Sequence, residues 1–519
     1  MDEDHAKLNE HAVDRWDDEC DVLVVGFGGA GACAAIEAAR AGARTLVVER
    51  AGGGGGTTAL STGVIYMGGG TRVQRACGFE DSIEEMLAFV RMAAGRGCEE
   101  QRVRMFCEGS LDHFDWLCSL GVEFADAYEG EKTTHPFGEE GLHYSGNETV
   151  HPFVEHARPA PRGHKPRQAG EAGAYLMRTL NEAAEASGAR VLSDCAARRL
   201  VVDDDATVIG LIATLNGRTI AVRAQSGVIL CAGGFIMNDA MLEEHAPMLL
   251  ECNYKAASAY DDGSGITIGC GAGAAAINMD EGLVLNAYYP PGAHAKGILV
   301  DEQGRRFINE DAYIGRASDA ILTKARGRAW LIVDNDLWGK TQVPHKLVAV
   351  EESFSELERS LGMPTGQLVA TIEAFNRNAA AGVDPDHHKS KEYLRPLHVP
   401  PYAALDCTTT GSIFGALTFG GLATLPTTEV VDSDGRVIPG LYAAGRNAAG
   451  VCREGRTYAS GLSIGDATFF GRVAGTRAAS RIPGAPQDRT ASKNATSVRD
   501  GPRGNGKRRS KGAKMRPDS

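Results

Sequence analysis

Three glycines and an acid near the start of the chain have the spacing of a phosphate-binding turn. Gly26, Gly28 and Gly31 directly follow an apolar run. In such a turn the first glycine permits the tight bend, the second lets the backbone approach a pyrophosphate, and the third lets helix pack on strand. Glu49 ends a second apolar run, where a carboxylate can accept hydrogen bonds from a ribose diol. The pattern predicts a dinucleotide site and disfavours NADP, because Glu49 would repel a 2′-phosphate.

The elements that must position this turn are two strands and the helix between them. Residues 21–26 and 43–49 are apolar runs of strand type, and residues 32–40 continue from the glycines as a helix. The helix N-terminus would then present free N–H groups to the phosphates. This order of elements predicts an α/β fold. A glycine-rich turn without a ligand is the alternative for the same pattern.

The composition is that of a soluble globular enzyme. The chain has 519 residues, of which 43% are hydrophobic and 23% are charged. Such values exclude a disordered, collagenous or disulfide-scaffold protein. The 65 glycines are well above the usual share, so many backbone positions are expected to need a positive φ or a close approach to a ligand.

The charge is unevenly distributed along the chain. The net charge of −13 argues against nucleic acid as the main partner. Residues 489–519 carry a net +8, which leaves −21 on the rest. This basic tail lacks an apolar period and is predicted to be disordered. A solvated extension is the plain interpretation, and a loose contact with an anionic membrane or nucleic acid is the alternative.

Cysteine usage and the N-terminus indicate a cytoplasmic protein. The twelve cysteines include no CxxC pair and no paired Cys/His spacing. We therefore expect reduced, mostly buried thiols and no metal site. The first twenty residues are acidic, whereas a signal peptide needs a basic start and an apolar stretch. We expect no export and no transmembrane segment.

Four further glycine motifs carry a family resemblance. Five consecutive glycines, 52–56, lead into residues 57–63, and glycine strands or turns follow at 226–235, 262–265 and 440–445. This set resembles the fumarate reductase and 3-ketosteroid dehydrogenase flavoprotein superfamily over most of the chain. The resemblance implies FAD as the cofactor.

The resemblance also implies a domain organisation. A discontinuous Rossmann-like FAD-binding domain is expected at residues 18–283 and 418–482, with an inserted α+β cap/catalytic domain at 284–417. Residues 483–519 would form the disordered basic tail. A cleft between the two domains is the expected place for substrate.

The attachment and the contacts of the flavin follow from the same resemblance. No histidine occurs between His11 and His113, so the glycine loop offers none for covalent attachment, and non-covalent FAD is expected. Arg446 stands where the superfamily usually has a glutamate on the ribityl chain. The residues expected to contact FAD are Gly26, Gly28, Gly29, Ala30, Gly31, Glu49, Arg50, Gly56, Thr57, Thr58, Ser61, Gly63, Ala197, Ala232, Gly233, Asp262, Gly445, Arg446, Gly461, Leu462, Ser463 and Ile464.

Three positions distinguish this chain from the fumarate reductases it resembles. Ile314 stands where those enzymes place a proton-donating arginine, Leu417 where they place a substrate-binding histidine, and Tyr458 where they place a carboxylate-binding arginine. A dianion would be left unpaired in such a site, at a cost of several kcal/mol. The sequence therefore favours a small apolar, steroid-like ketone as substrate, with an electron acceptor that the sequence does not identify.

Two tyrosines and a serine are the candidate catalytic residues, and residues 456–466 resemble the Δ4-(5α) branch of the 3-ketosteroid dehydrogenases. Tyr313 would take or relay the C4 proton of a 3-keto-5α-steroid. Tyr458 and Ser460 would complete a hydroxyl chain toward solvent, and the C5 hydride would pass to flavin N5. A phenol can exchange a proton with an enolising ketone when a neighbouring hydroxyl shares its charge. Backbone N–H groups of residues 461–465 are the expected oxyanion donors.

Other interpretations of these residues stay open. A buried tyrosine is commonly a packing residue whose hydroxyl bonds a carbonyl, and Ser460 could be a turn residue. A Δ1-dehydrogenase or another flavin-dependent enone reductase would use the same motifs, and a non-catalytic flavin electron-transfer protein would use the cofactor site alone. The residues that could line a steroid pocket or simply pack in the core are Tyr66, Trp116, Tyr288 and Tyr289.

Overall fold

The predicted strand, glycine turn and helix form at the centre of the largest sheet. The computed structural model describes residues 5–482. In it, β2 (Asp18–Val25) and β3 (Thr45–Val48) pair in parallel, and α1 (Gly29–Arg40) connects them. Their valines and leucines are buried on both faces, as expected for parallel strands with layers above and below. The expected basic tail, residues 483–519, lies outside the described part of the chain.

The largest sheet has nine strands. Its order is β1-β9-β10-β11-β2-β3-β8, and β22 joins beside β11 and carries β21. Neighbours from β22 through β11, β2 and β3 to β8 are parallel, so their carboxyl ends meet at one edge. The strands not yet given bounds are β1 (Leu8–Asn9), β8 (Arg190–Leu192), β9 (Cys195–Val202), β10 (Val208–Leu215), β11 (Arg218–Leu230), β21 (Glu429–Val431) and β22 (Val437–Ala443).

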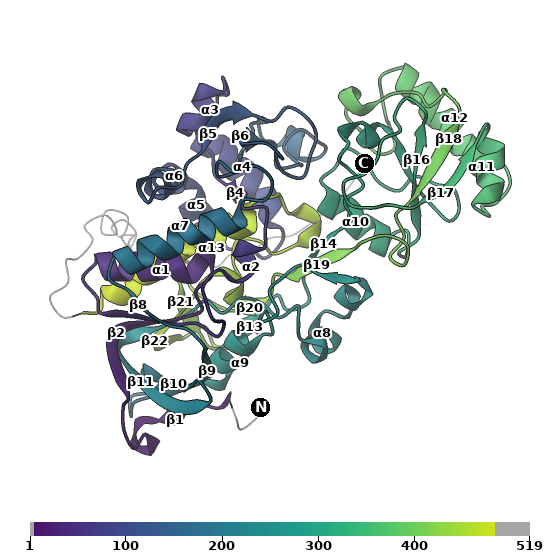
Figure 1. Ribbon diagram of the computed structural model, residues 1–519. Coiled ribbons are helices and arrows are strands. Elements are labelled where there is room, and N and C mark those ends of the chain that lie inside the picture. The colour runs from purple at the N-terminus through teal and green to yellow at the C-terminus, as the bar shows by residue number, and fades with distance from the viewer. Residues whose placement is uncertain (1–4, 483–519) are drawn as a thin grey trace, which may run out of the picture. The chain divides into compact units, whose positions relative to one another are not determined.

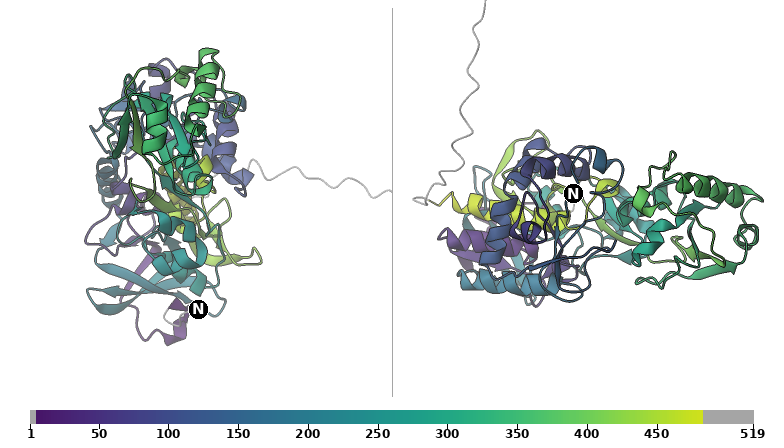
Figure 2. Two further views of the ribbon diagram at one scale, coloured as in Figure 1. Left: turned by 90° about the vertical axis from the view of Figure 1, so that its right-hand side faces the viewer. Right: turned by 90° about the horizontal axis from the view of Figure 1, so that it is seen from above.

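Helices from both ends of the chain pack together on this sheet. α13 (Leu462–Ala479) lies beside α1, with α7 (Gly173–Ala186) on the other side of α1 (Figures 1 and 2). The approach is close because Gly471 and Gly475 of α13 face the backbone of α1, where a Cβ would clash with carbonyl oxygens. The glycines thus bring the C-terminal helix against the helix of the glycine turn.

The residues expected to form the cap, 284–417, contain a separate antiparallel sheet. Its order is β15-β16-β18-β17, and α11 packs against β17 and β18 (Figure 1). The elements of this segment are β15 (Ile298–Asp301), α10 (Ile314–Thr323), β16 (Ala329–Asp334), β17 (Leu347–Glu351), α11 (Phe354–Ser360), α12 (Gln367–Ala380) and β18 (Tyr402–Asp406).

Smaller sheets and helices complete the described chain. One four-stranded sheet has the order β4-β7-β6-β5, and two short sheets join β12-β19-β14 and β13-β20. These strands are β4 (Ile65–Tyr66), β5 (Ala125–Tyr128), β6 (Glu140–His143), β7 (Gly163–His164), β12 (Tyr254–Lys255), β13 (Ala276–Ile277), β14 (Gly282–Leu285), β19 (Gly415–Thr418) and β20 (Gly421–Leu422). The helices are α2 (Gly56–Ala59), α3 (Arg72–Ala76), α4 (Ile83–Ala94), α5 (Glu100–Glu108), α6 (Ser110–Ser119), α8 (Asp239–His245) and α9 (Ser264–Gly271). Short 3-10 turns are η2 (Glu10–Ala12), η3 (Phe153–Glu155), η4 (Pro247–Glu251), η5 (Gly292–Lys296), η6 (Lys391–Tyr393), η7 (Gly445–Asn447) and η8 (Gly455–Thr457).

The mixed α/β class predicted from the sequence is confirmed by these sheets and helices. The described residues pack as one compact unit, so the boundaries at 284 and 417 stay a prediction. All twelve cysteines are free thiols, eight of them buried. Between residues 5 and 482, no helix is both long and apolar enough to cross a membrane.

Candidate active site

One large cavity runs from the glycine turn to the cap segment. It has a volume of about 990 Å³ and is lined by residues of the first βα turn, of the segments that directly follow β11 and β22, and of the start of α13. It therefore opens at the carboxyl ends of parallel strands, where α/β folds bind their ligands.

The glycine turn leaves its backbone open to this cavity. Gly26 has φ +96°, and a Cβ there would lie 2.6 Å from the Cys231 carbonyl oxygen. A Cβ on Gly31 would clash with the Gly26 carbonyl, whereas Gly28 meets only ordinary contacts. Gly28 is the N-cap of α1 and has no side chain to cap the helix; the Thr58 hydroxyl accepts the Gly29 N–H at 3.3 Å. Unused N–H groups at a helix N-terminus suit a phosphate.

Glu49 joins the two strands of the cofactor turn at the cavity wall. Its carboxylate accepts one hydrogen bond from the Phe27 N–H and one from the Ala51 N–H, each at 2.7 Å. Each oxygen therefore keeps a free lone pair. The carboxylate lines the cavity and can still accept the ribose hydroxyls for which the sequence predicts it.

Arg446 is paired with an acid that the sequence did not point to. Its guanidinium forms an ion pair with Asp261, which also accepts a hydrogen bond from Thr57 Oγ1 at 3.0 Å. The arginine that replaces the superfamily's glutamate is therefore neutralised at the cavity wall. Asp261 directly precedes the turn at 262–265, but its pairing was not predictable because its partners lie far away in the sequence.

The three candidate catalytic residues lie together at the other end of the cavity. The rings of Tyr313 and Tyr458 have centroids 6.0 Å apart and are tilted by 48°. Ser460 lies near enough to the Tyr313 hydroxyl to lower its pKa. The Tyr458 hydroxyl accepts the Ser463 N–H at 3.3 Å, at the N-terminus of α13. Tyr458 therefore keeps its own proton free to donate.

Burial controls the ionisation of both tyrosines. Burial raises the pKa of Tyr313, and the nearby Ser460 hydroxyl opposes that rise. Burial also raises the pKa of Tyr458 well above its ordinary value, while the backbone amides of Gly461 and Ser463 lower it in part. Both phenols are therefore neutral at physiological pH, so each can act as a proton donor or as a link in a relay.

The cavity wall near the tyrosines is apolar. Ile314 and Leu417, which replace the polar groups of the fumarate reductases, both line it. The other apolar side chains that share this wall are Leu283, Leu285, Ala287, Val343 and Ile413. A charged substrate would find no partner among these residues, whereas a flat apolar molecule would fit against them.

A family of known proteins matches this arrangement along the chain. A family described as an FAD binding domain matches residues 21–459. The chain belongs to this family. It is thus an FAD-binding oxidoreductase, and the superfamily resemblance drawn from the motifs is confirmed.

Relatives of this FAD-binding protein include steroid-converting enzymes. The crystal structure of 3-ketosteroid-Δ4-(5α)-dehydrogenase from Rhodococcus jostii RHA1, in complex with 4-androstene-3,17-dione, is 42% identical and has a TM-score of 0.86; the match covers 91% of this chain and 99% of that one. The 3-oxo-5-alpha-steroid 4-dehydrogenase of Comamonas testosteroni is 28% identical over 83% of this chain and 93% of its own. The 3-ketosteroid Δ1-dehydrogenase of Sterolibacterium denitrificans shares the fold at 21% identity and a TM-score of 0.66, covering 89% of this chain and 100% of its own.

The end of the cavity at the glycine turn suits FAD. The N-terminus of α1 and the free lone pairs of Glu49 suit the diphosphate and the ribose. FAD is the cofactor of the family, as the glycine motifs predict. Its non-covalent attachment stays a prediction.

Most of the expected FAD contacts line the cavity. Three of them do not: Gly31 and Gly63 face backbone of neighbouring segments, and Leu462 is buried at the start of α13. One run of lining residues that the sequence analysis missed extends from β12 to the loop before α9. It consists of Tyr254, Ala256, Ala257, Ser258, Ala259, Tyr260 and Asp261.

Four aromatic residues that could line a steroid pocket lie elsewhere. Tyr288 and Tyr289 donate their hydroxyl protons to the Glu310 and Ala312 carbonyls. The Trp116 ring nitrogen donates to Glu37 on α1, and Tyr66 is fully buried. None of the four lines the cavity, so for these residues the packing interpretation is correct.

The expected oxyanion donors are partly used within the protein. The N–H groups of Leu462 and Gly465 bond the Ala459 and Gly461 carbonyls, and that of Ser463 bonds the Tyr458 hydroxyl. The Ser463 N–H therefore acts on the cavity through the Tyr458 hydroxyl that it bonds.

Proposed function

We propose that this flavoprotein dehydrogenates a 3-ketosteroid at its CH–CH bond, introducing a 4,5 double bond. One observation carries the proposal: two neutral tyrosines and a serine stand in an otherwise apolar wall of the cavity that holds the FAD motifs. The 42% identical relative, whose structure contains 4-androstene-3,17-dione, supports the steroid class and the position of the double bond.

The proposed chemistry divides the work between the tyrosines. The Tyr458 hydroxyl donates a hydrogen bond to the substrate's 3-keto oxygen, and the Ser463 N–H supports it as the enolate forms. Tyr313 accepts the proton from C4 while its own hydroxyl proton moves to Ser460, and Ser460 releases a proton toward solvent, so the net charge of the pair is unchanged. Bound FAD would supply the acceptor for the hydride that leaves C5. The substrate thus loses one proton and one hydride, and the 4,5 double bond forms.

The organisation around this chemistry is part of the proposal. Residues 18–283 and 418–482 form the Rossmann-like FAD-binding domain, and residues 284–417 form the α+β cap that contributes Tyr313. FAD is contacted by the expected residues that line the cavity. We also propose that the protein works in the cytoplasm and receives its steroid as a free small molecule.

The decisive experiment is an anaerobic stopped-flow titration of the holoprotein with 5α-androstane-3,17-dione. We expect flavin bleaching and a product with a 4,5 double bond, identified by mass and NMR. A 1,2 double bond would overturn the regiochemistry and favour a Δ1-dehydrogenase. No bleaching by any 3-ketosteroid would overturn the substrate class and leave an electron-transfer flavoprotein.

Substitution of the two tyrosines tests their roles. Tyr313→Phe and Tyr458→Phe keep the rings but remove the hydroxyls, so turnover should fall about 100-fold or more while FAD stays bound. Tyr175→Phe is the control, because the Tyr175 hydroxyl contacts only the Gly121 carbonyl, at the surface. Near-normal turnover in both active-site variants would show that these hydroxyls do no chemistry.

A further inference from the structure

A single buried turn contacts all three proposed catalytic residues. It follows β6 and consists of residues 145–148. Asn147 is its central member and is fully buried. The Asn147 Oδ1 accepts the Tyr313 N–H at 3.2 Å, and the Asn147 Nδ2 donates to the Tyr458 carbonyl at 2.8 Å. One side chain thus ties together the backbones of two tyrosines that come from distant parts of the sequence.

The neighbours of Asn147 in this turn make two further contacts with the site. The Ser460 N–H donates to the Ser145 carbonyl at 3.2 Å. Gly146 packs flat on Tyr313, since a Cβ there would lie 2.5 Å from Tyr313 Cδ2. The turn therefore fixes the backbone of Ser460 and the ring of Tyr313 as well.

The turn is held rigid from within by Glu148. Its carboxylate accepts hydrogen bonds from the Ser145 and Gly146 N–H groups, at 3.1 and 3.0 Å, and from the Ser145 hydroxyl. Glu148 is only 1% exposed. With its own amides satisfied, the turn presents Asn147 in one orientation.

We infer that Asn147 is a positioning residue that sets the distance between Tyr313 and Tyr458 for the proposed dehydrogenation. The inference rests on the proposed function, because it concerns the same two hydroxyls. Asn147 does not line the cavity, so it acts through the tyrosines and not on the substrate. A displacement of about 1 Å between catalytic groups can cost about 100-fold in rate, so a clamp between them affects turnover more than binding.

Asn147→Ala is the first test. It removes both hydrogen bonds and leaves the tyrosine side chains unchanged. We expect full FAD content, a steroid dissociation constant within about 3-fold of the wild-type value, and a kcat at least about 10-fold lower. The steroid constant is measured by perturbation of the flavin spectrum with the product-like 4-androstene-3,17-dione.

Asn147→Asp should give the ratio of variant to wild-type kcat a pH dependence that a merely structural role would not produce. A protonated carboxyl can accept from the Tyr313 N–H and donate to the Tyr458 carbonyl, whereas an ionised one can only accept. The ratio of variant to wild-type kcat should therefore fall as pH rises through the titration of the new carboxyl. Glu148 is the ionisable neighbour in the same turn, and the ratio removes its effect because both proteins contain it.

Asn376 provides a matched control in the cap segment. Its side chain also bridges backbone groups, donating to the Leu397 carbonyl and accepting the Leu397 N–H, each at 2.8 Å. Asn376→Ala should lower the unfolding temperature and leave kcat unchanged.

The outcomes separate this inference from the proposed function. If wild-type protein oxidises no 3-ketosteroid, the proposed function fails and the clamp's role fails with it. If wild type turns over and Asn147→Ala keeps a wild-type kcat, the positioning role is overturned while the function stands. If Asn147→Ala loses FAD or does not fold, Asn147→Asp decides: a pH-independent ratio of kcat overturns the inference.

Discussion

Within the described residues, Ser460 is the side chain that favours the ionised form of Tyr313 against the effect of burial. Burial raises the pKa of Tyr313, and the Ser460 hydroxyl lowers it in part. The negative charge that builds on the Tyr313 oxygen as its own proton leaves would therefore be shared with one neighbour. Among residues of the described chain, this makes Ser460 the side chain that tunes the proposed relay.

Ser460→Ala should move the pH dependence of turnover. Without the hydroxyl the pKa of Tyr313 rises further, so the rising limb of kcat/KM against pH should shift to higher pH and turnover at neutral pH should fall about 10-fold or more. The measurement is kcat/KM from pH 6 to 11. Ser187→Ala serves as the control, because that hydroxyl bonds only the Ala183 carbonyl at the end of α7. An unshifted limb would remove Ser460 from the relay.

Residue types that carry local motifs could be predicted, whereas their long-range partners could not. Tyr313, Tyr458 and Ser460 were found because each stands next to a motif that marks the active site. Asn147 stands next to none, and Asp261 directly precedes the turn at 262–265 without being part of it. Their importance comes from hydrogen bonds to residues more than a hundred positions away, which only the folded chain brings together.

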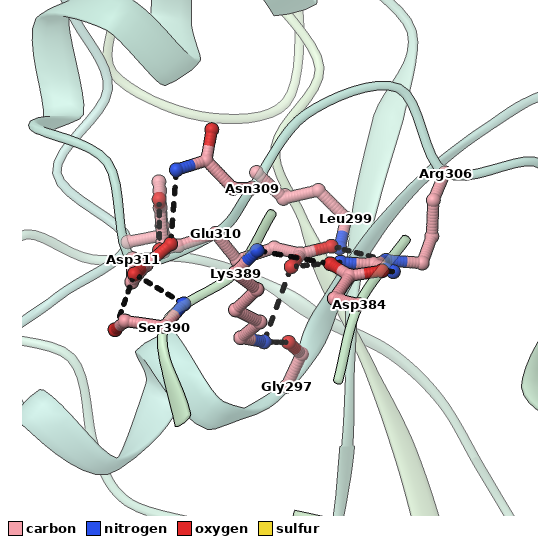
Figure 3. A network of polar contacts seen from close by, with 10 residues as sticks. Gly297, Leu299, Arg306, Asn309, Glu310, Asp311, Asp384, Lys389 and Ser390 are labelled. Atoms are coloured by element: carbon pink, nitrogen blue, oxygen red, sulfur yellow. Dashed lines mark hydrogen bonds and ion pairs between the residues drawn. The ribbon is translucent and has the colours of Figure 1, made fainter. Parts of the chain in front are cut away.

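At the scale of elements, a buried ion network fastens the strands and loops of the cap segment (Figure 3). Arg306 pairs with Glu310 at 2.8 Å and with Asp384 at 3.0 Å, and Lys389 pairs with Glu310 at 3.1 Å. The second Glu310 oxygen accepts the Leu299 N–H of β15. Residues 306–310 thus have a structural role here, with two positive charges facing two negative ones.

Glu310→Gln should destabilise the cap segment strongly. It leaves Lys389 and Arg306 with one carboxylate fewer in a buried site, and breaking a buried ion pair costs about 3–5 kcal/mol. The free energy of unfolding is measured by denaturation of the holoprotein, with hydrogen exchange at β15 and β16 to localise the loss. Glu302→Gln is the control, since its pair with Arg328 is exposed and should contribute at most about 1 kcal/mol.

The same network predicts a pH dependence. Burial alone would raise the pKa of Glu310, but the charges of Arg306 and Lys389 lower it to about 2. A carboxyl whose pKa is lower in the folded state stabilises fully above its unfolded pKa of about 4.3, and this contribution is lost as pH falls toward 2. The stability difference between wild type and Glu310→Gln should therefore shrink over that range. A constant difference would mean that the charge of Glu310 contributes nothing.

Whole strands and helices could be predicted where residues that are neighbours in the sequence define them. The run from β2 through α1 to β3 was predicted because apolar strands, a glycine turn and a helix follow each other directly. The antiparallel sheet of the cap segment was expected only as a class, because its strands pair in the order β15-β16-β18-β17, which no short-range pattern encodes. Tyr288 and Tyr289 illustrate the same limit: their hydroxyls bond carbonyls within this segment, away from the cavity.

At the scale of the whole molecule, the cofactor cavity joins segments from both ends of the chain. Its walls extend from Val25 at the end of β2 to Ala467 in α13, and α13 packs on α1. A ligand that bridges these segments binds only the folded chain. FAD should therefore stabilise the global fold and not just its own loops.

Removal of FAD should lower the unfolding temperature, and its return should restore it. With free FAD at about 1,000 times its dissociation constant, the stabilisation is about 4 kcal/mol, since binding to the native state adds RT ln(1 + [L]/Kd). ADP carries only the diphosphate and adenosine half of FAD, and it should restore part of this stabilisation by binding at the N-terminus of α1. Riboflavin lacks the phosphates and should restore less. Thermal unfolding of the apoprotein with each ligand measures the three effects. If riboflavin raised the unfolding temperature as much as FAD does, the glycine turn would contribute nothing to cofactor binding. If apoprotein and holoprotein unfolded at the same temperature, the cofactor would not couple the two ends of the chain.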